Sequence, residues 1–444
     1  MEICTVGGYE EVGKNMTAVK VGEDVILIDC GFFLPGVIEL QEHHELNYTT
    51  RGLRRVGGIP DDRVLDDLGW RNKVKAIVFS HAHLDHIGGL PFLIDRYPNA
   101  QLFGTPFTMK VLESLIEDAK VMVPNKMNIV KPNSTHAINS ELKIEFIHVT
   151  HSTLECSLIA IHTKKGIFFY TLDFKFDDHP IIENPPNYSR LKEIGKIGVK
   201  VLIMNSLYAA KEEPNGGESD AAKMLQEAFN NLNEKKDSAI FITTFSSHIE
   251  RLTTIVNLAQ KTGREIIFLG RSLEKYVRCA IEIGKCPFKN KIKIMKYRRQ
   301  VESMLKKIEQ DRGKYVVVCT GHQGEKNSIL DRIVKKQTHF IFRPGDNLIF
   351  STSIIPTEVN IEARKILDAK LKKLGVNLQT NVHVHGHGSK HSKEKILDLL
   401  KPEFVIPSHA SIEQEKDMMD VAKEKGYVPG KTVFLVKNGK TFNF

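Results

Sequence analysis

The sequence predicts an α/β protein in which one domain is inserted into another. Three observations support this prediction. The motif HAHLDH (81–86) directly follows a strand-like run, and a block from Val201 to about Asn360 alternates apolar strands with helical stretches. His409, which we expect to share a site with HAHLDH, lies beyond that block. The middle block is therefore interpreted as an insertion, and a chain of 444 residues is long enough for two cores.

The motif HAHLDH carries four metal-binding side chains in six residues. It follows VKAIVFS (74–80), so it lies where a buried strand ends and a loop begins. In extended backbone His81 and His83 point the same way and can bind one ion, whereas Asp85 and His86 turn away and can begin a second site. Imidazole and carboxylate ligands together suit zinc or manganese at a catalytic site with an open water position. Solvated loop histidines are the alternative, but this spacing after an apolar strand is rare by chance.

Further candidates for the same site each follow an apolar run. His151 follows IEFIHVT, Asp173 follows GIFFYTL and His409 follows FVIPS. Loops at strand ends are held by a rigid sheet, which gathers functional groups in a layered α/β fold. Singly, His151 and His409 would be ordinary polar residues, but with HAHLDH we interpret them as ligands. Asp29, at the end of VILID, is expected to orient a ligand histidine or the nucleophilic water.

This order of motifs resembles the metallo-β-lactamase superfamily, whose fold is an αββα sandwich. The segments GGYEEVGKNMTAV, TTFSSHIERL, TGHQGE and VHVHGHGSK are similar to its β-CASP branch, which acts on nucleic acids, and within it to the shorter, archaeal form of the ribonuclease J family. The resemblance extends from Met1 to about residue 430. It implies a metallo-β-lactamase domain over 1–205 and 361–444, with a β-CASP α/β domain inserted at 206–360.

The resemblance also assigns roles to the candidate residues. His387 would lie beside the scissile phosphate, oriented by residue 205, and Asp29 and Asp85 would take part in catalysis. The cofactors would be two Zn²⁺ ions per chain, with Mn²⁺ or Mg²⁺ as substitutes. The predicted ligands are His81, His83 and His151 for one ion, Asp85, His86 and His409 for the other, and Asp173 as the bridge. The residues expected to bind the substrate's terminal phosphate are Ser247, His248, His383, His385 and Gly386.

The implied function is a ribonuclease that hydrolyses single-stranded RNA from the 5′ end to 5′-mononucleotides, with endonuclease activity in addition. Two residues depart from the family pattern. Asn205 stands where the family usually carries Asp or Glu, and an amide can orient His387 but cannot stabilise an imidazolium. His385 replaces the usual serine of the phosphate pocket. The alternatives are an RNA 3′-end-processing endonuclease of the cleavage-and-polyadenylation type, a DNA-acting relative, or a nucleic-acid-binding protein with a degenerate site.

Charge and composition agree with a nucleic-acid substrate. The formal net charge is +9, and the segment 285–307 carries nine basic residues and one acid, which would attract a polyanion. Without an 18-residue apolar stretch or a signal-peptide pattern, we expect a cytoplasmic protein that does not enter the membrane. The six cysteines form no C-x-x-C pair, so we expect reduced buried thiols. Only ~35 residues follow His409, which favours a homodimer over the tetramer expected of relatives with a C-terminal domain.

Overall fold

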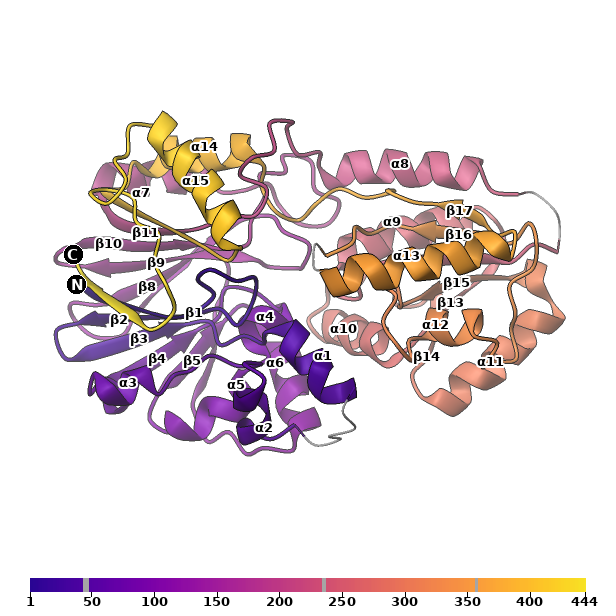
Figure 1. The fold of residues 1–444 in the computed structure, drawn as a ribbon, viewed down its shortest axis with the longest axis horizontal. Helices are drawn as coiled ribbons and strands as arrows, with labels where there is room; N and C mark the ends of the chain where they lie inside the picture. The colour runs from indigo at the N-terminus through magenta and orange to yellow at the C-terminus, as the bar shows by residue number, and fades with distance from the viewer. Residues whose placement is uncertain (43–47, 234–236, 356–357) are drawn as a thin grey trace. The chain divides into compact units, whose positions relative to one another are not determined.

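The computed structural model describes residues 1–42, 48–233, 237–355 and 358–444 (Figure 1). The chain forms two compact units. Unit 1 comprises Met1–Asp178, Asn184–Asn215 and Gly386–Phe444, and unit 2 comprises His179–Glu183 and Gly216–His385. Unit 2 is therefore inserted into the sequence of unit 1.

Unit 1 is built on two β-sheets that face each other. The first has the strand order β19-β1-β2-β3-β4-β5-β6, and the second has the order β18-β11-β10-β9-β8-β7. The strands of the first sheet are β1 (Glu2–Gly7), β2 (Met16–Val21), β3 (Asp24–Ile28), β4 (Val74–Val78), β5 (Gln101–Gly104), β6 (Met127–Ile129) and β19 (Lys440–Asn443). Those of the second are β7 (Ser134–Ala137), β8 (Lys143–His148), β9 (Ser157–Thr163), β10 (Gly166–Thr171), β11 (Val199–Asn205) and β18 (Phe404–Ser408).

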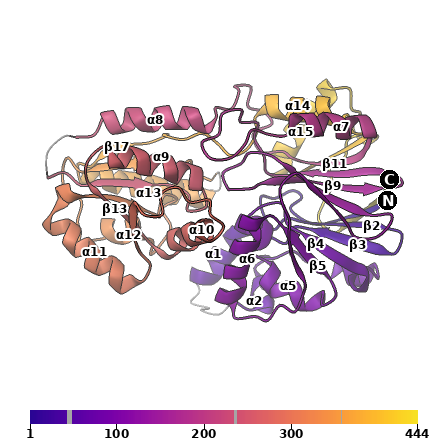
Figure 2. The ribbon, with the colours of Figure 1, turned by 180° about the vertical axis from the view of Figure 1, so that it is seen from behind.

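The core of unit 1 follows from strands that are apolar on both faces. In β10, Phe168 and Tyr170 point into the core between the two sheets, whereas Phe169 points to the outer face. That outer face is covered by α7 (Tyr188–Ile197), α14 (Lys390–Leu400) and α15 (Ile412–Glu424), as Figure 2 shows from behind. Helices on both outer faces make unit 1 an αββα sandwich. On the first sheet they are α1 (Leu34–Glu42), α2 (Thr50–Arg55), α3 (Val64–Asp67), α4 (Leu84–Ile87), α5 (Leu90–Leu93) and α6 (Pro106–Ala119) (Figure 1).

Unit 2 is an α/β domain around one parallel sheet, as the alternation of strands and helices predicts. Its strand order is β14-β13-β15-β12-β16-β17, and each of these pairs is parallel. The strands are β12 (Ile240–Thr243), β13 (Glu265–Leu269), β14 (Ile292–Met295), β15 (Tyr315–Cys319), β16 (Asn347–Phe350) and β17 (Asn377–Gln379). The helices are α8 (Glu218–Asn230), α9 (Ile249–Gln260), α10 (Arg271–Glu282), α11 (Arg298–Gln310), α12 (Ile329–Val334) and α13 (Glu358–Lys373).

The unit boundaries differ from the predicted ones. The sequence prediction placed the insertion at 206–360, whereas unit 2 runs from Gly216 to His385 and residues 206–215 belong to unit 1. The segment 361–385 joins unit 2 because β17 pairs with β16, and Leu367 and Leu371 of α13 are buried in that unit's core. The strand β17 has only three residues, all half-buried, so its sequence carries too weak an apolar pattern to be recognised.

Two further expectations concern the cysteines and the membrane. All six cysteines are free and buried, in agreement with the expected reduced thiols. Within the ranges that the structure describes, no helix is both long enough and apolar enough to span a bilayer.

Candidate active site

The predicted metal ligands meet at one end of the two sheets of unit 1. Each of them lies just beyond a strand or in the short helix α4, so the sheets fix its position. Together they form two groups of four that share one carboxylate, and in each group the ligand atoms lie within 4.8 Å of one another. The first group is His81, His83, His151 and Asp173, and the second is Asp85, His86, Asp173 and His409.

The first group has the spacing of a single metal site. His83 Nδ1 lies 3.1 Å from His81 Nε2 and 3.1 Å from His151 Nε2. Asp173 Oδ2 lies 3.6 Å from His81 Nε2 and 3.5 Å from His151 Nε2. Ligands at 2.0–2.1 Å from a tetrahedral zinc lie roughly 3.3 Å apart, so these four atoms fit around one ion. Burial lowers the pKa of His151 to about 3, which keeps its imidazole in the neutral form that binds metals.

The second group has a similar spacing around Asp85 and both oxygen atoms of Asp173. His86 Nε2 lies 3.3 Å from Asp173 Oδ2 and 3.6 Å from Asp85 Oδ2. His409 Nε2 lies 3.5 Å from Asp173 Oδ1 and 3.7 Å from Asp85 Oδ2. Because Asp173 contacts both groups, its carboxylate is placed to bridge two ions. The cluster of histidines and aspartates is therefore compatible with a metal centre.

Hydrogen bonds behind the ligands fix their ring tautomers. His86 Nδ1–H donates to Asp29 Oδ2 over 2.7 Å, and Asp29 also accepts the backbone N–H of Ser80. His151 Nδ1–H donates to the carbonyl oxygen of Gly386 over 2.6 Å. Both contacts leave Nε2 free to bind a metal. Gly386 must lack a side chain, since a Cβ there would lie 2.6 Å from Ser152 Oγ and 3.0 Å from the His151 ring.

Asn15 is a member of this centre that sequence reasoning did not single out. Its side chain is fully buried, and Oδ1 accepts a hydrogen bond from His409 Nδ1–H over 2.9 Å. Its Nδ2 donates to the carbonyl oxygen of Asp85 over 2.9 Å and lies 3.2 Å from His86 Nε2. Asn15 thus contacts Asp85, His86 and His409, which are the three ligands that belong to the second group alone. In the sequence analysis the segment GGYEEVGKNMTAV, which contains Asn15, supported only the resemblance to the family. Its neighbouring residues give no sign that Asn15 contacts His409.

Replacing Asn15 by alanine is expected to weaken metal binding at the second group by roughly 10- to 100-fold, because His409 loses the acceptor that orients it. The first group should retain its ion. The check is the metal content per chain after dialysis at graded chelator concentrations. Asn15→Asp keeps an acceptor for His409 and should lose less affinity. Two ions bound as tightly in Asn15→Ala as in the wild type would contradict this role.

Asn205 and His387 lie beside the shared carboxylate. Asn205 Nδ2 donates to Asp173 Oδ1 over 2.9 Å and lies 3.2 Å from His387 Nδ1, while Oδ1 accepts the Leu207 N–H over 2.7 Å. These partners fix the orientation of the amide, so a donor faces His387 Nδ1 and the ring carries its hydrogen on Nε2. Burial lowers the pKa of His387 well below its ordinary value. Asn205 therefore contacts the shared carboxylate as well as the His387 ring.

Lys393 is a buried cation beneath this pair. Its side chain is fully buried, with Nζ 3.4 Å from Asn205 Oδ1 and 4.9 Å from the ring centre of Phe174. Burial lowers the pKa of Lys393 to about 7. A lysine in the segment KHSKEKILDLL gives no sign in the sequence that it faces inward, so the pattern did not reveal it.

Lys393→Met is expected to stabilise the fold, with a gain that depends on pH. The unfolded chain takes up the Lys393 proton below about pH 10.5 and the folded chain only below about pH 7, so this lysine destabilises the fold increasingly as pH falls between these values. The gain in Lys393→Met should therefore be largest below pH 7 and vanish above about pH 10.5. Urea unfolding of both proteins across this range measures it. A gain that does not vary with pH would contradict the burial of this charge.

One of the predicted phosphate-binding residues of unit 2, His383, contacts a buried arginine, Arg251. Ser247 and His248 lie between β12 and α9, and His383 and His385 follow β17. Arg251 Nη1 donates to His383 Nδ1 over 3.1 Å, so the remaining hydrogen of this ring lies on Nε2. Burial, reinforced by the Arg251 charge, lowers the pKa of His383 well below its ordinary value.

Arg251 itself is held by a bidentate ion pair. Its Nε and Nη2 lie 2.9 and 3.1 Å from the carboxylate oxygens of Glu218, and Nη1 donates to Ser351 Oγ over 3.0 Å. His248 Nε2 lies 3.4 Å from the same carboxylate. Sequence reasoning did not single out Arg251 or Glu218. Gly386, predicted with this group, belongs to unit 1 and contacts His151 instead.

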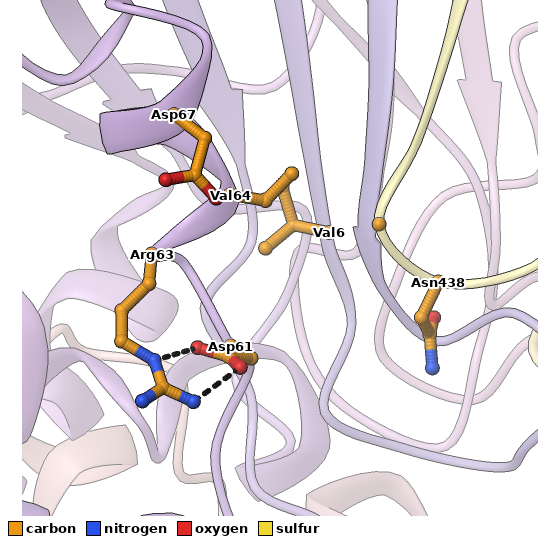
Figure 3. Close-up of a pocket in the computed structure, with 7 residues that line it drawn as sticks. Val6, Asp61, Arg63, Val64, Asp67 and Asn438 are labelled. Carbon is orange, nitrogen blue, oxygen red and sulfur yellow. Dashed lines mark hydrogen bonds and ion pairs between the residues drawn. The ribbon is translucent and has the colours of Figure 1, made fainter.

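A separate hollow of about 550 Å³ opens on unit 1 (Figure 3). None of the predicted site residues lines it. The Arg63 guanidinium donates to both carboxylate oxygens of Asp61, over 2.7 and 2.6 Å, so its charge is already compensated. We therefore assign no function to this hollow. Its lining is Val6, Asp61, Arg63, Val64, Asp67, Asn438 and Gly439.

The fold and the site together define a class of protein. An αββα sandwich with this cluster of histidines and aspartates at one end of its sheets, interrupted by a parallel α/β domain, is a metal-dependent hydrolase of the metallo-β-lactamase superfamily. The metallo-β-lactamase superfamily matches residues 9–104, and the ribonuclease J β-CASP domain matches residues 237–368. The predicted fold class is thereby confirmed.

Comparison with individual proteins identifies the family. The chain is 38% identical to ribonuclease J of Pyrococcus abyssi, over 99% of this chain and 96% of the relative. It is 35% identical to ribonuclease J of Methanocaldococcus jannaschii, over 100% and 99% of the two chains. A crystal structure of a protein of unknown function from Enterococcus faecalis has the same fold, with a TM-score of 0.64 at 16% identity over 99% of both chains. The chain belongs to the ribonuclease J family, which confirms the predicted enzyme class, a metal-dependent ribonuclease.

Proposed function

We propose that this enzyme degrades single-stranded RNA from the 5′ end, releasing 5′-mononucleotides, and that it also cleaves internally. The observation that carries the proposal is the pair of ligand groups sharing Asp173, with His387 beside them. This arrangement suits hydrolysis of a phosphodiester. The names of the relatives, ribonuclease J, support RNA as the substrate.

The ligand residues fit two divalent ions, and nitrogen-rich groups of this kind favour zinc over magnesium. When bound, the ions supply Lewis acidity that favours ionisation of a water and offsets negative charge on the reacting phosphate. Asp29 holds His86 in the tautomer that leaves Nε2 free, and Gly386 does the same for His151. Asn205 holds both Asp173 and the His387 ring.

His387 is placed to act on the substrate as a neutral donor. Asn205 faces its Nδ1, so Nε2–H is the hydrogen that can reach a phosphate oxygen. The side chain is 22% exposed, which leaves it accessible to a substrate. We infer that His387 donates a hydrogen bond to a non-bridging oxygen of the scissile phosphate.

In this proposal, the direction of degradation depends on the predicted phosphate-binding residues of unit 2. We infer that Ser247 and His383 bind the 5′-phosphate of the first nucleotide, with His248 and His385 in support and Arg251 holding the His383 ring. The His383 ring presents Nε2–H because its Nδ1 accepts from Arg251. A closed pocket for one phosphate admits a monophosphate more readily than a triphosphate, which is larger and more highly charged.

Ser247→Ala is expected to reduce the preference for 5′-monophosphate RNA over 5′-triphosphate RNA by roughly tenfold or more, because a hydrogen bond to a charged group is lost. The measurement is a time course on gels with both RNAs and a matched DNA. Ser303→Ala, an exposed serine on α11, is the control. If both ends react at equal rates and a ladder of internal fragments forms, the enzyme is an endonuclease instead.

We further propose a cytoplasmic location, which is supported by the six buried free thiols. The homodimer stays a prediction, and light scattering of the purified enzyme would check it.

A further inference from the structure

The basic segment 285–307 of unit 2 is not used by the function proposed above. Three of its nine cations are paired, Lys285 with Glu183, Lys293 with Glu265 and Lys296 with Glu274. Its one acid, Glu302, pairs with Arg332. The remaining six cations are exposed and have no ion-pair partner among the residues that the structure describes. They are Lys289, Lys291, Arg298, Arg299, Lys306 and Lys307.

The part of this segment after β14 lies on the same edge of the sheet as the phosphate pocket. All six strands are parallel, so the residues that follow them share one edge, where ligands bind in open α/β sheets. From β12 the order along this edge is β15, β13 and β14, so the ends of β12 and β14 lie roughly 15 Å apart. Hydrogen bonds join the loops along this edge. Ser246 Oγ, after β12, donates to Ser272 Oγ, after β13, over 3.1 Å, and the Gly270 N–H donates to the Met295 carbonyl oxygen at the end of β14 over 2.9 Å.

Four exposed side chains define what we name the edge patch: Arg271, which follows β13, and Tyr297, Arg298 and Arg299, which follow β14. The Tyr297 side chain is 57% exposed, with Lys296 Nζ 5.5 Å from its ring centre. Arginines bind phosphates, and an exposed aromatic ring stacks on a base of any identity. Single-stranded nucleic acid offers both partners together.

Protection of the edge strand β14 explains the cations in only part of the segment. Lysines on an edge strand prevent the sheet from pairing with another molecule, which accounts for Lys291 and Lys293 at β14. It does not account for Arg271 or for Tyr297 and its two arginines, which lie beyond the strand ends. Nor does it account for an exposed aromatic ring among cations, since an isolated tyrosine gives no protection against strand pairing.

We propose that the edge patch is a docking surface for single-stranded RNA, where it binds nucleotides that do not themselves react. Phosphates contact Arg271, Arg298 and Arg299, and one base stacks on Tyr297. The inference rests on the proposed function, since it takes RNA as the substrate. Substrates long enough to reach the patch are bound more tightly than short ones, and this advantage weakens as salt concentration rises.

The test compares two double variants that remove the same charge from the same segment. Arg298→Ala/Arg299→Ala alters the patch, whereas Lys306→Ala/Lys307→Ala, further along α11, leaves it intact. Each is assayed with 5′-monophosphate RNAs of about 4 and about 30 nucleotides, chosen at the lower limit and well above single-strand site sizes. The patch variant should raise the ratio of the KM for long RNA to the KM for short RNA roughly tenfold. Its log–log salt slope for long RNA should fall by roughly 1.4, because two phosphate contacts are lost. The lysine variant should change both quantities far less.

Tyr297→Ala tests the aromatic contact separately. Loss of one stacked base should raise the KM for long RNA roughly fivefold or more, and Tyr297→Trp should restore it. Equal effects in the arginine and lysine variants would overturn the proposal, because only net charge would then matter. So would an unchanged KM ratio in the patch variants.

Binding without turnover separates this proposal from the proposed function. Fluorescence anisotropy with the 30-nucleotide RNA, in a His81→Ala background, follows docking whether or not the enzyme cleaves RNA. An inactive wild type with patch-dependent binding would refute the proposed function and retain the docking surface. An active wild type whose RNA binding does not depend on the patch would refute the docking surface and retain the proposed function.

Discussion

Replacing His81 by alanine lowers RNA hydrolysis by at least ~10²-fold in our expectation, because generating the nucleophile and neutralising charge both depend on a complete pair of metal sites. His81 is fully buried, and its Nε2 lies 3.1 Å from His83 Nδ1 and 3.6 Å from Asp173 Oδ2. Its loss removes one ligand of the first group and leaves the unshared ligands of the second in place. RNA binding should persist, since the proposed phosphate and base contacts of unit 2 are left unchanged.

The measurement for His81→Ala is the single-turnover rate at saturating RNA, together with metal content and RNA affinity. His391→Ala is the matched control, because that histidine is 65% exposed and lies outside both ligand groups. It should leave the rate at the wild-type level. Near-normal turnover by His81→Ala in metal-depleted buffer would rule out a two-metal mechanism.

The largest effect on stability is expected for Arg251→Met. The variant leaves the Glu218 carboxylate buried without its bidentate partner, which costs about 3–5 kcal/mol. Glu218 and Arg251 are 1% and 0% exposed, so water cannot take over the lost contacts. Unit 2 should therefore unfold at a lower denaturant concentration. Because the one tryptophan, Trp70, lies in unit 1, hydrogen exchange of β12 and β16 is the suitable probe.

Two further variants test the explanation for Arg251. Arg278→Met disrupts an exposed arginine–glutamate contact on α10 and should cost under about 1 kcal/mol. The double variant Arg251→Met/Glu218→Met removes both charges and should recover much of the lost stability. If the double variant is as unstable as Arg251→Met, the cost comes from lost packing and not from an unpaired carboxylate.

The sequence predicts this site to the extent that its information is local. HAHLDH and the other ligands each follow an apolar run, and a strand end can be recognised from its immediate neighbours. Asn15 cannot be found in this way, since its partner His409 lies 394 residues further along the chain. In the sequence nothing distinguishes Arg251 from other charged residues on helices, and only the fold shows that it pairs with Glu218. The ligands' metal binding stays a prediction that the metal-content measurements would test.

The difference between local patterns and tertiary contacts also explains which parts of the fold the sequence predicted. Alternating strands and helices predicted the parallel sheet of unit 2, because β12, β13, β15 and β16 are continuous apolar runs separated by helical stretches. The end of the insertion was placed at 360, inside α13 and before β17, because β17 is three half-buried residues whose place is fixed by pairing with β16. Strand pairing depends on the tertiary structure, and the sequence of a short strand gives almost no sign of its partner.

The split sequence of unit 1 has a consequence for how the enzyme is made. The strands of unit 2 all lie between residues 240 and 379, so that unit can fold as soon as this stretch has left the ribosome. Unit 1 must wait, because β11 needs β18 and β1 needs β19 as neighbours. His409 follows β18, so the second ligand group is completed only after unit 2 has been synthesised. A nascent chain of this enzyme can therefore hold a folded unit 2 well before its second ligand group is complete.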